Sequence, residues 1–284
     1  MQIEVKDLSY TYNPKSPFAK QALNGVNLSV EKGEMLAIIG HTGSGKSTFV
    51  QHLNGLIKVQ SGSVIVNGID LTAKKPDFTS LRKEVGMVFQ YPEYQLFADT
   101  VAIDVAFGPK NAKMEKEEID RRVKEAIEMV GLDYNLTAQK SPFDLSGGER
   151  RRAALAGVLA TNPGILILDE PTAGLDPQGK GQILSIVRQL NKQKGVTVIM
   201  VSHDMNEIYE NADRVVLFEE GKVLGDAATQ EMFDGREIKG LELPAMAVIK
   251  NLLREKGQDI KGLKVKDVAQ SIIDIYNKRR KGNV

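Results

Sequence analysis

Short apolar runs alternate along most of this chain with charged segments whose apolar residues recur at helical spacing. Four runs are almost wholly apolar, as strands buried on both faces of a sheet are: residues 35–39, 165–168, 196–201 and 215–218. Looser strand candidates are residues 3–8, 26–30, 63–66 and 85–89. Helices are expected over residues 115–130 and 148–160. This alternation predicts an α/β fold with a mainly parallel sheet and helices on both faces.

The pattern changes after Gly235. Residues 236–284 contain no strand-like run, but they include two stretches in which apolar residues recur at helical spacing. The clearer stretch precedes a basic run at 278–281, and its apolar stripe consists of Val265, Val268, Ala269, Ile272, Ile273 and Tyr276. We therefore expect residues 1–235 to form one large domain and residues 236–284 to form a small helical domain.

Composition narrows the class of protein. The chain has 284 residues and a net charge of only +1. Nucleic-acid-binding domains usually carry a strong basic excess, so no nucleic-acid partner is expected. The absence of cysteine excludes disulfides and thiolate metal sites. No apolar run is long enough to span a bilayer, so any membrane role has to come through a partner.

The first motif with chemical content follows the apolar run 35–39 and matches the Gly-x-x-x-x-Gly-Lys-Ser/Thr pattern of a phosphate-binding loop. It consists of Gly40, His41, Thr42, Gly43, Ser44, Gly45, Lys46, Ser47 and Thr48. Its glycines allow backbone N–H groups to surround phosphate oxygens at the start of a helix. Lys46 is expected to reach the β- and γ-phosphates, and the Ser47 hydroxyl to bind Mg²⁺. The motif therefore predicts a site for a nucleoside triphosphate with Mg²⁺.

Two acids, Asp169 and Glu170, directly follow the apolar run 165–168. Ligands bind at the C-terminal ends of the strands in open parallel sheets, so both carboxylates are expected in the nucleotide site. Hard oxygen ligands suit Mg²⁺, which makes Asp169 the expected metal partner. Glu170 is then free to orient and polarise the attacking water.

A second glycine-rich segment stands before the predicted helix 148–160, in the run Leu145-Ser146-Gly147-Gly148-Glu149. A serine followed by two glycines leaves backbone amides exposed and makes a second anion-binding helix start. The phosphate-binding loop already surrounds the triphosphate on one side. Ser146, Gly147 and Gly148 are therefore expected to clamp a triphosphate from the opposite side.

Together and in this order, the three motifs resemble those of the ATP-binding subunits of ABC (ATP-binding cassette) transporters. The resemblance implies ATP as the nucleotide and a phosphate-loop NTPase fold of the ABC type. In that fold an antiparallel β subdomain and a helical subdomain, here about residues 91–160, accompany the parallel core. It also implies a head-to-tail dimer in which Ser146, Gly147 and Gly148 serve the opposing subunit. Glu149 departs from the family pattern, since glutamine is usual at this place.

Smaller marks match further family positions. Gln90, after the run 85–89, matches the glutamine that senses Mg²⁺ near the transmembrane partner, and His203 matches the switch histidine that contacts the γ-phosphate. Residues 173–176 match the loop that crosses the dimer interface. Tyr12 matches the aromatic residue that stacks on adenine, with Tyr10 as its rival, because both flank Thr11 in one strand-like run.

Four flanking stretches narrow the resemblance to the energy-coupling factor (ECF) transporter ATP-binding proteins: residues 88–97, 104–111, 141–144 and 154–160. Within this family, the stretch 88–97 resembles that of the second of the two paralogous ATPases in the vitamin-importing complexes. The family implies a peripheral subunit on the cytoplasmic membrane face that hydrolyses ATP to import a vitamin or a transition-metal ion. Its partners would be a paralogous ATPase, bound partly through the C-terminal helices, a transmembrane coupling protein, and through that protein a substrate-binding membrane component. The alternatives are another ABC transporter's ATPase and a soluble ABC ATPase.

Acids lie among aromatic residues in the stretch after Gln90. Coupling proteins of the ECF family carry arginines on their cytoplasmic coupling helices, and carboxylates bind arginine through two parallel hydrogen bonds. We therefore expect at least one of Glu93, Asp99 and Asp104 to accept such an arginine.

Overall fold

A six-stranded, mostly parallel sheet forms the centre of the computed structural model, which describes residues 1–234, 238, 240–255, 257–258 and 265–282. The strand order is β10-β9-β3-β8-β7-β6. The pairs from β9 to β6 are parallel, and only the edge strand β10 runs antiparallel to its neighbour. The strands are β3 (Met35–Ile39), β6 (Val85–Val88), β7 (Ile165–Asp169), β8 (Thr197–Val201), β9 (Arg214–Glu219) and β10 (Lys222–Ala228). This order brings the C-terminal ends of β3, β6, β7 and β8 to one edge.

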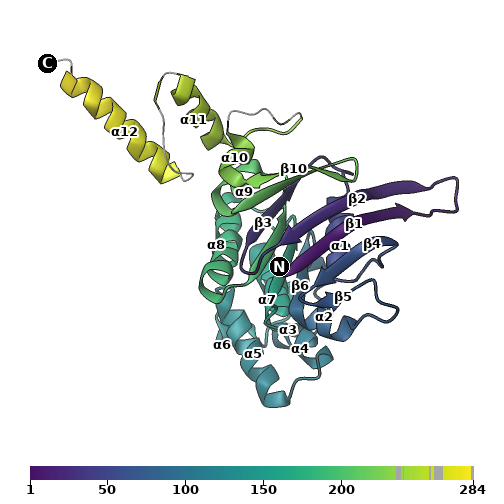
Figure 1. Cartoon of the computed structure of the whole chain (residues 1–284). Coiled ribbons are helices and arrows are strands. Elements are labelled where there is room, and N and C mark those ends of the chain that lie inside the picture. The colour runs from purple at the N-terminus through teal and green to yellow at the C-terminus, as the bar shows by residue number, and fades with distance from the viewer. Residues whose placement is uncertain (235–237, 239, 256, 259–264, 283–284) are drawn as a thin grey trace.

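A second sheet, antiparallel throughout, packs beside the first (Figure 1). Its order is β2-β1-β4-β5, and its strands are β1 (Ile3–Tyr12), β2 (Lys20–Val30), β4 (Ser61–Val66) and β5 (Ile69–Asp70). Helix α1 (Lys46–Leu53) contributes Phe49 to the apolar core shared by the two sheets, where its ring lies 5.2 Å from that of Phe218. Helix α1 therefore packs in the apolar core between the two sheets.

The helical part lies on the other side of the central sheet, at the bottom of Figure 1. Helix α5 (Lys116–Met129) buries Ile119, Val123, Ala126 and Ile127, the stripe expected from the sequence. That stripe packs against α7 (Gly147–Leu159) in a single apolar cluster. Shorter helical segments complete this part: α3 (Val101–Val105), α4 (Phe107–Asn111), α6 (Tyr134–Thr137), and the 3-10 turns η1 (Pro92–Gln95) and η2 (Pro142–Asp144).

The remaining helices flank the central sheet or follow it. They are α2 (Phe78–Glu84), α8 (Pro177–Lys194), α9 (Met205–Asn211), α10 (Thr229–Phe233), α11 (Ala245–Glu255) and α12 (Val265–Gly282). The last two coincide with the two amphipathic stretches, and Ile272, Ile273 and Tyr276 of α12 are exposed. The basic side chains at 278–281 lie outside the described residues. Within the described part of the chain, no helix combines the length and apolarity needed to cross a bilayer.

The parallel core with its antiparallel sheet and helical layer is the α/β architecture expected from the sequence. Differences are confined to element ends and small elements. In the apolar run 196–201 the strand begins one residue late, at Thr197, and β6 ends at Val88 rather than at Phe89. Strand β10 was not expected, because none of its residues is buried and it contains Gly225 and Asp226.

Candidate functional site

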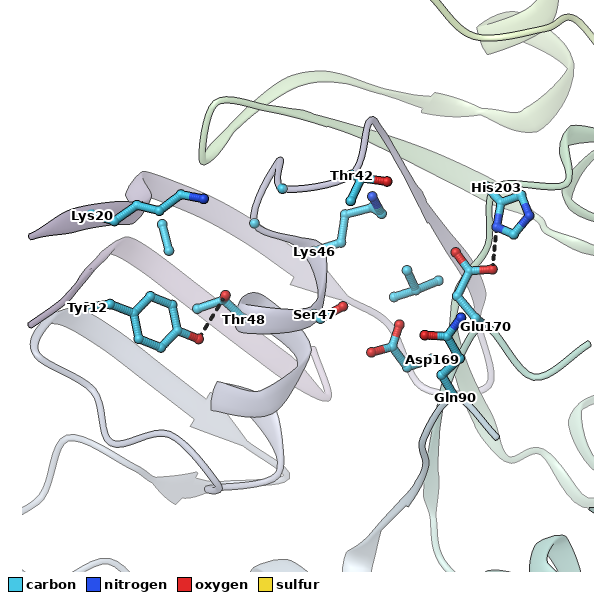
Figure 2. Close-up of a pocket in the computed structure, with 14 residues that line it drawn as sticks. Tyr12, Lys20, Thr42, Lys46, Ser47, Thr48, Gln90, Asp169, Glu170 and His203 are labelled. Carbon is cyan, nitrogen blue, oxygen red and sulfur yellow. Dashed lines mark hydrogen bonds and ion pairs between the residues drawn. The ribbon is translucent and has the colours of Figure 1, made fainter. Parts of the chain in front are cut away.

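A cavity of about 520 Å³ lies at the edge where β3, β6, β7 and β8 end (Figure 2). It gathers most of the residues expected to bind nucleotide or Mg²⁺, although they come from five separate stretches of chain. The expected residues that line it are Tyr12, Thr42, Gly43, Gly45, Lys46, Ser47, Thr48, Gln90, Asp169, Glu170 and His203. Gly40, His41 and Ser44 belong to the same loop but are not part of the cavity wall. The His41 ring instead packs against Gly240.

The glycines of the loop between β3 and α1 have two different roles. A Cβ on Gly40 would lie 2.1 Å from the Phe218 carbonyl oxygen, and one on Gly45 would lie 2.5 Å from the Ala22 carbonyl oxygen. Both residues have positive φ, so they let the loop lie directly on neighbouring strands. Gly43, by contrast, has nothing within 4 Å of its Cβ position. Its open side leaves room for a ligand to approach the backbone.

Lys46 begins α1 and spans the loop. Its Nζ donates to the carbonyl oxygens of Gly40, at 2.7 Å, and His41, at 2.9 Å. Burial lowers the pKa of Lys46, and the nearby carboxylates of Glu170 and Asp169 oppose that shift. The cation therefore faces both the phosphate loop and the acidic pair, as Figure 2 shows.

Asp169 and Glu170 leave the end of β7 in the expected place, but their surroundings differ. Asp169 is buried, which raises its pKa, while a hydrogen bond from Ser47 and the charge of Lys46 oppose the rise. Glu170 has a left-handed backbone with φ of 54°. Its Oε2 lies 2.6 Å from Nδ1 of His203, at the end of β8 (Figure 2). Burial also raises the pKa of Glu170, against the influence of His203. A raised pKa in reach of a histidine suits a base at neutral pH.

The two candidate adenine partners occupy different positions. Tyr12 is 36% exposed and lines the cavity, and its hydroxyl lies 3.2 Å from Oγ1 of Thr48. Tyr10 is not part of that wall, and packs edge-to-face against both Tyr12 and His52. His52 is fully buried, and burial lowers its pKa. Tyr12 is thus the aromatic ring available to a base, with Tyr10 and His52 supporting it from behind.

Ser146, Gly147 and Gly148 lie elsewhere. They line a second cavity, of about 680 Å³, together with residues of η1 and of the loop after β7. Ser146 caps α7 and exchanges hydrogen bonds with Glu149, since the Ser146 N–H donates to the Glu149 carboxylate at 2.9 Å. The Ser146 hydroxyl also donates to that carboxylate, at 2.6 Å, and these bonds lower the pKa of Glu149. Among the described residues of one chain, the two glycine-rich helix starts therefore open into separate cavities.

Two of the three acids expected to bind a partner arginine are already used within the chain. Glu93 forms a bidentate ion pair with Arg151. The carboxylate of Asp104 is buried and accepts from the backbone N–H groups of Phe97, at 2.9 Å, and Ala98, at 2.8 Å. Only Asp99 is exposed. Linear sequence places acids beside aromatic residues but does not show what folds against them.

Sequence reasoning missed several residues around the site. Lys20 lines the first cavity. Strand pairing could have identified it, because Lys20 lies opposite Tyr12 in the β1–β2 ladder. Behind His203, Glu207 accepts from Thr172 at 2.7 Å, and Lys180 lies 2.9 Å from Asp204 and 3.1 Å from Glu207. This network ties the loop after β7 to the loop after β8 through α9. No short sequence motif predicts this network.

Comparisons with known proteins agree with this geometry. The ABC transporter family model matches residues 23–173. Among solved structures, "cbiO1 from clostridium perfringens: Part of the ABC transporter complex cbiONQ" is 36% identical with a TM-score of 0.73, covering 89% of this chain and 93% of that one. The ATP-binding cassette MJ0796, in a dimeric post-hydrolysis state bound to ADP and Pi, is 30% identical with a TM-score of 0.71, covering 80% and 98%.

Curated relatives are closer in sequence. The energy-coupling factor transporter ATP-binding protein EcfA2 of Clostridium perfringens is 51% identical over 263 residues, which is 92% of each chain. Its namesake from Clostridium tetani is 45% identical over 284 residues, covering 98% of this chain and 99% of that one. By these matches and by its fold, the chain belongs to the ABC family, and within it to the energy-coupling factor transporter ATP-binding proteins.

Proposed function

We propose that this chain hydrolyses ATP as one half of a dimeric motor that drives an ECF-type importer of a vitamin or a transition-metal ion. The observation that carries the proposal is the pairing of Glu170 with His203 across a cavity that also holds Lys46 and Ser47. A nucleotide-binding regulator would not need a base with a raised pKa held at 2.6 Å by a histidine.

In the proposed reaction, the N–H groups of residues 40–48 surround the phosphates while Lys46 moves its ammonium from loop carbonyls to the β- and γ-oxygens. Tyr12 stacks on adenine. Glu170 accepts the proton of the attacking water, and His203 holds the Glu170 carboxylate in place while contacting the γ-phosphate. Lys20, opposite Tyr12 in the β1–β2 ladder, adds a positive charge at the rim.

Mg²⁺ fits the donors at the cavity floor. Ser47, Asp169 and Gln90 supply oxygen atoms there, and Asp169 already accepts a hydrogen bond from Ser47. The described residues contain no group of three or more His, Cys, Asp or Glu that could hold a metal ion. The single carboxylate of Asp169 suits Mg²⁺, which is commonly bound through one or two carboxylates and completes its shell with phosphate oxygens and water. When bound, the ion neutralises charge on the β- and γ-phosphates.

Ser146, Gly147 and Gly148 are proposed to complete the cavity of an opposing subunit rather than their own. Their placement in a separate cavity supports this division. The opposing subunit is proposed to be a paralogous ATPase. The domain boundaries remain proposals as well, with residues 1–235 as the ATPase domain and α11 and α12, in residues 236–284, helping to join the two subunits.

Docking to a membrane coupling protein, on the cytoplasmic face, is proposed for the surface around η1 and α3. Tyr94, Phe97, Ile103 and Phe107 are exposed there, and Phe97 packs edge-to-face on Phe107. Exposed aromatic residues grouped in this way are typical of a site that binds a partner helix. Asp99 is the exposed acid beside them and the remaining candidate to bind an arginine.

The test is uptake by cells in which the native gene is replaced by a wild-type or variant copy. A panel of vitamins and transition-metal ions is supplied, and the membrane proteins that co-purify with the chain are identified. Asp99→Lys is expected to reduce co-purification and uptake while leaving ATP binding unchanged. The matched control is Asp120→Lys on the exposed face of α5, which should change neither. Wild-type chain that binds no membrane protein and supports no uptake would contradict the proposal.

A further inference from the structure

Arg151 is the most deeply buried charged side chain near the site that the proposed reaction does not use. Its side chain is only 3% exposed, and it lies on α7, four residues past Gly147. Its neighbours Arg150 and Arg152 are partly exposed. A buried guanidinium is tolerated only when its charge is paired and its N–H groups have acceptors.

The first partner of Arg151 is in η1, on the proposed membrane-docking surface. Nε and Nη2 donate to the two carboxylate oxygens of Glu93, each at 2.9 Å. The guanidinium also lies over the ring of Tyr91, 5.6 Å from its centre. The segment 91–95 is therefore held to α7 by a planar, two-point contact that a lysine could not reproduce.

The second set of partners belongs to the loop that carries the catalytic carboxylate. Nη1 donates to the carbonyl oxygens of Ala173, at 2.6 Å, and Pro171, at 3.3 Å. These residues form a turn with Glu170, because the N–H of Ala173 donates to the Glu170 carbonyl oxygen at 3.2 Å. Glu170 has a left-handed backbone, so its placement depends on its neighbours holding the turn closed.

The two contacts meet on one rigid group. Four hydrogen bonds donated by the planar guanidinium fix Glu93 and the turn 170–173 relative to each other. The ring of Tyr91 packs against the guanidinium as well. A Cβ placed on Gly174 would lie 3.4 Å from the Tyr91 ring, so the ring packs directly on the same loop. A displacement of η1 therefore changes the acceptors available to Arg151, and with them the position of the turn.

We propose that Arg151 is a positioning residue that links the segment 91–95 to the turn 170–173, so that the state of the docking surface sets the alignment of Glu170. The inference rests on the proposed role of Glu170 as the base in ATP hydrolysis. Arg151 also lines the cavity of Ser146 and Gly147, but its guanidinium bonds to Glu93 and to the turn, so the proposal assigns it no contact with nucleotide. It also gives Glu93 a defined partner within the chain.

The test is a cycle of two substitutions in the full-length chain, assembled with its partners. Arg151→Lys keeps the charge but removes the bidentate contact and the reach to the carbonyls. It is expected to lower kcat by up to about 100-fold, the effect of misplacing a catalytic group by about 1 Å. KM and ATP affinity are expected to stay within about twofold of wild type, since no nucleotide contact is lost. Arg121→Lys, which alters a bidentate pair with Glu118 on the surface of α5, is the matched control and should have no effect.

The decisive step repeats Arg151→Lys in a Glu170→Gln background and measures single turnovers. If Arg151 acts through Glu170, Arg151→Lys lowers turnover only a little further in a chain that already carries Glu170→Gln. A general structural role would lower turnover by the same factor in both backgrounds and would overturn the proposal. Unchanged kcat in Arg151→Lys would overturn it too.

Should Arg151→Lys fail to fold, Glu93→Gln replaces it. That variant keeps one acceptor oxygen for Arg151 and is expected to show the same dependence on Glu170 with a smaller loss. Wild-type turnover in Glu170→Gln alone would instead overturn the proposed function, so the two failures are distinguishable.

Discussion

The two glycine-rich helix starts of this chain, at α1 and α7, differ in what surrounds them and in how their first N–H groups are used. Helix α1 begins inside the nucleotide cavity after Gly45, which has a left-handed backbone and offers no side-chain cap. Helix α7 begins at the surface, where Ser146 and Glu149 cap each other's backbone. An uncapped start leaves N–H groups for a ligand, whereas a capped start has already satisfied some of them.

The difference fits the proposed division, in which the chain binds its own nucleotide at α1 and offers the start of α7 to an opposing subunit. Around α1, the strand ends provide Asp169, Glu170 and His203 within the same cavity. Around α7, Ser146 and Gly147 are exposed, and the other residues of that cavity include no acidic pair like Asp169 and Glu170. Substitutions at the two helix starts should therefore affect different properties.

The largest effect is expected from Lys46→Ala. The cation that faces both the phosphate loop and the carboxylates is removed, so ATP binding should weaken strongly and turnover should fall below detection. The fold should persist, because Lys46 bonds only to loop carbonyls. ATP titration, steady-state ATPase assays and circular dichroism check these outcomes. A well-folded variant with near-normal ATPase activity would be incompatible with the assigned site.

Glu170→Gln should separate binding from chemistry. Removal of a general base typically lowers turnover by about 10²–10⁴-fold, whereas the phosphate contacts survive. The variant should therefore bind ATP and accumulate an ATP-bound closed dimer, measured by light scattering. Retained turnover, or failure of ATP to promote association, would mean that another group is the base.

Stability as a function of pH should reveal opposite behaviour of Glu170, in the cavity beside α1, and Glu149, which helps to cap α7. Burial raises the pKa of Glu170, so the carboxyl group stays protonated in the folded protein at pH values where the unfolded chain, with a pKa of about 4.3, has lost the proton. Wild-type stability is reduced as pH rises through this window, and Glu170→Gln should gain in Tm over wild type there and keep the gain above it.

Glu149 is the matched comparison. Hydrogen bonds from Ser146 lower its pKa, so its contribution is present above the unfolded pKa and lost as pH falls through the folded value. Glu149→Gln should therefore lose Tm relative to wild type as pH rises. Thermal melts of all three nucleotide-free proteins from acidic to neutral pH check both signs. Differences that do not vary with pH, or that share one sign, would contradict the pKa directions.

The smallest effect is expected when Glu149→Gln is added to Glu170→Gln. The change removes a negative charge from a helix start proposed to face a triphosphate, while the amide can still accept from the Ser146 N–H. The ATP concentration that half-saturates association should fall by a few-fold, and more at low salt than at high salt. An increase in that concentration would indicate that the charge of Glu149 assists the clamp.

Sequence motifs anticipated the nucleotide cavity well, because each motif residue sits at the end of a buried strand or at the start of a helix. The packing between loops was harder to predict from the sequence. Glu93 and Arg151 are 58 residues apart, and three consecutive arginines hide which one faces inward. A signal was nevertheless present: Arg151, Leu155 and Leu159 recur at intervals of four and are all buried. Assigning the acid that meets it required the fold.

Strand order gives the loops around the cavity unequal freedom to move. Gln90 follows β6, which is the edge of the central sheet and pairs only with β7. Glu170 and His203 follow β7 and β8, each hydrogen-bonded to a strand on both sides. A displacement of the proposed docking surface can thus shift Gln90 by loosening one ladder, whereas Glu170 and His203 are anchored by two ladders and would respond only through a contact such as that of Arg151. The strand that precedes Gln90, beside the proposed docking surface, is therefore less firmly held than the strands that precede Glu170 and His203.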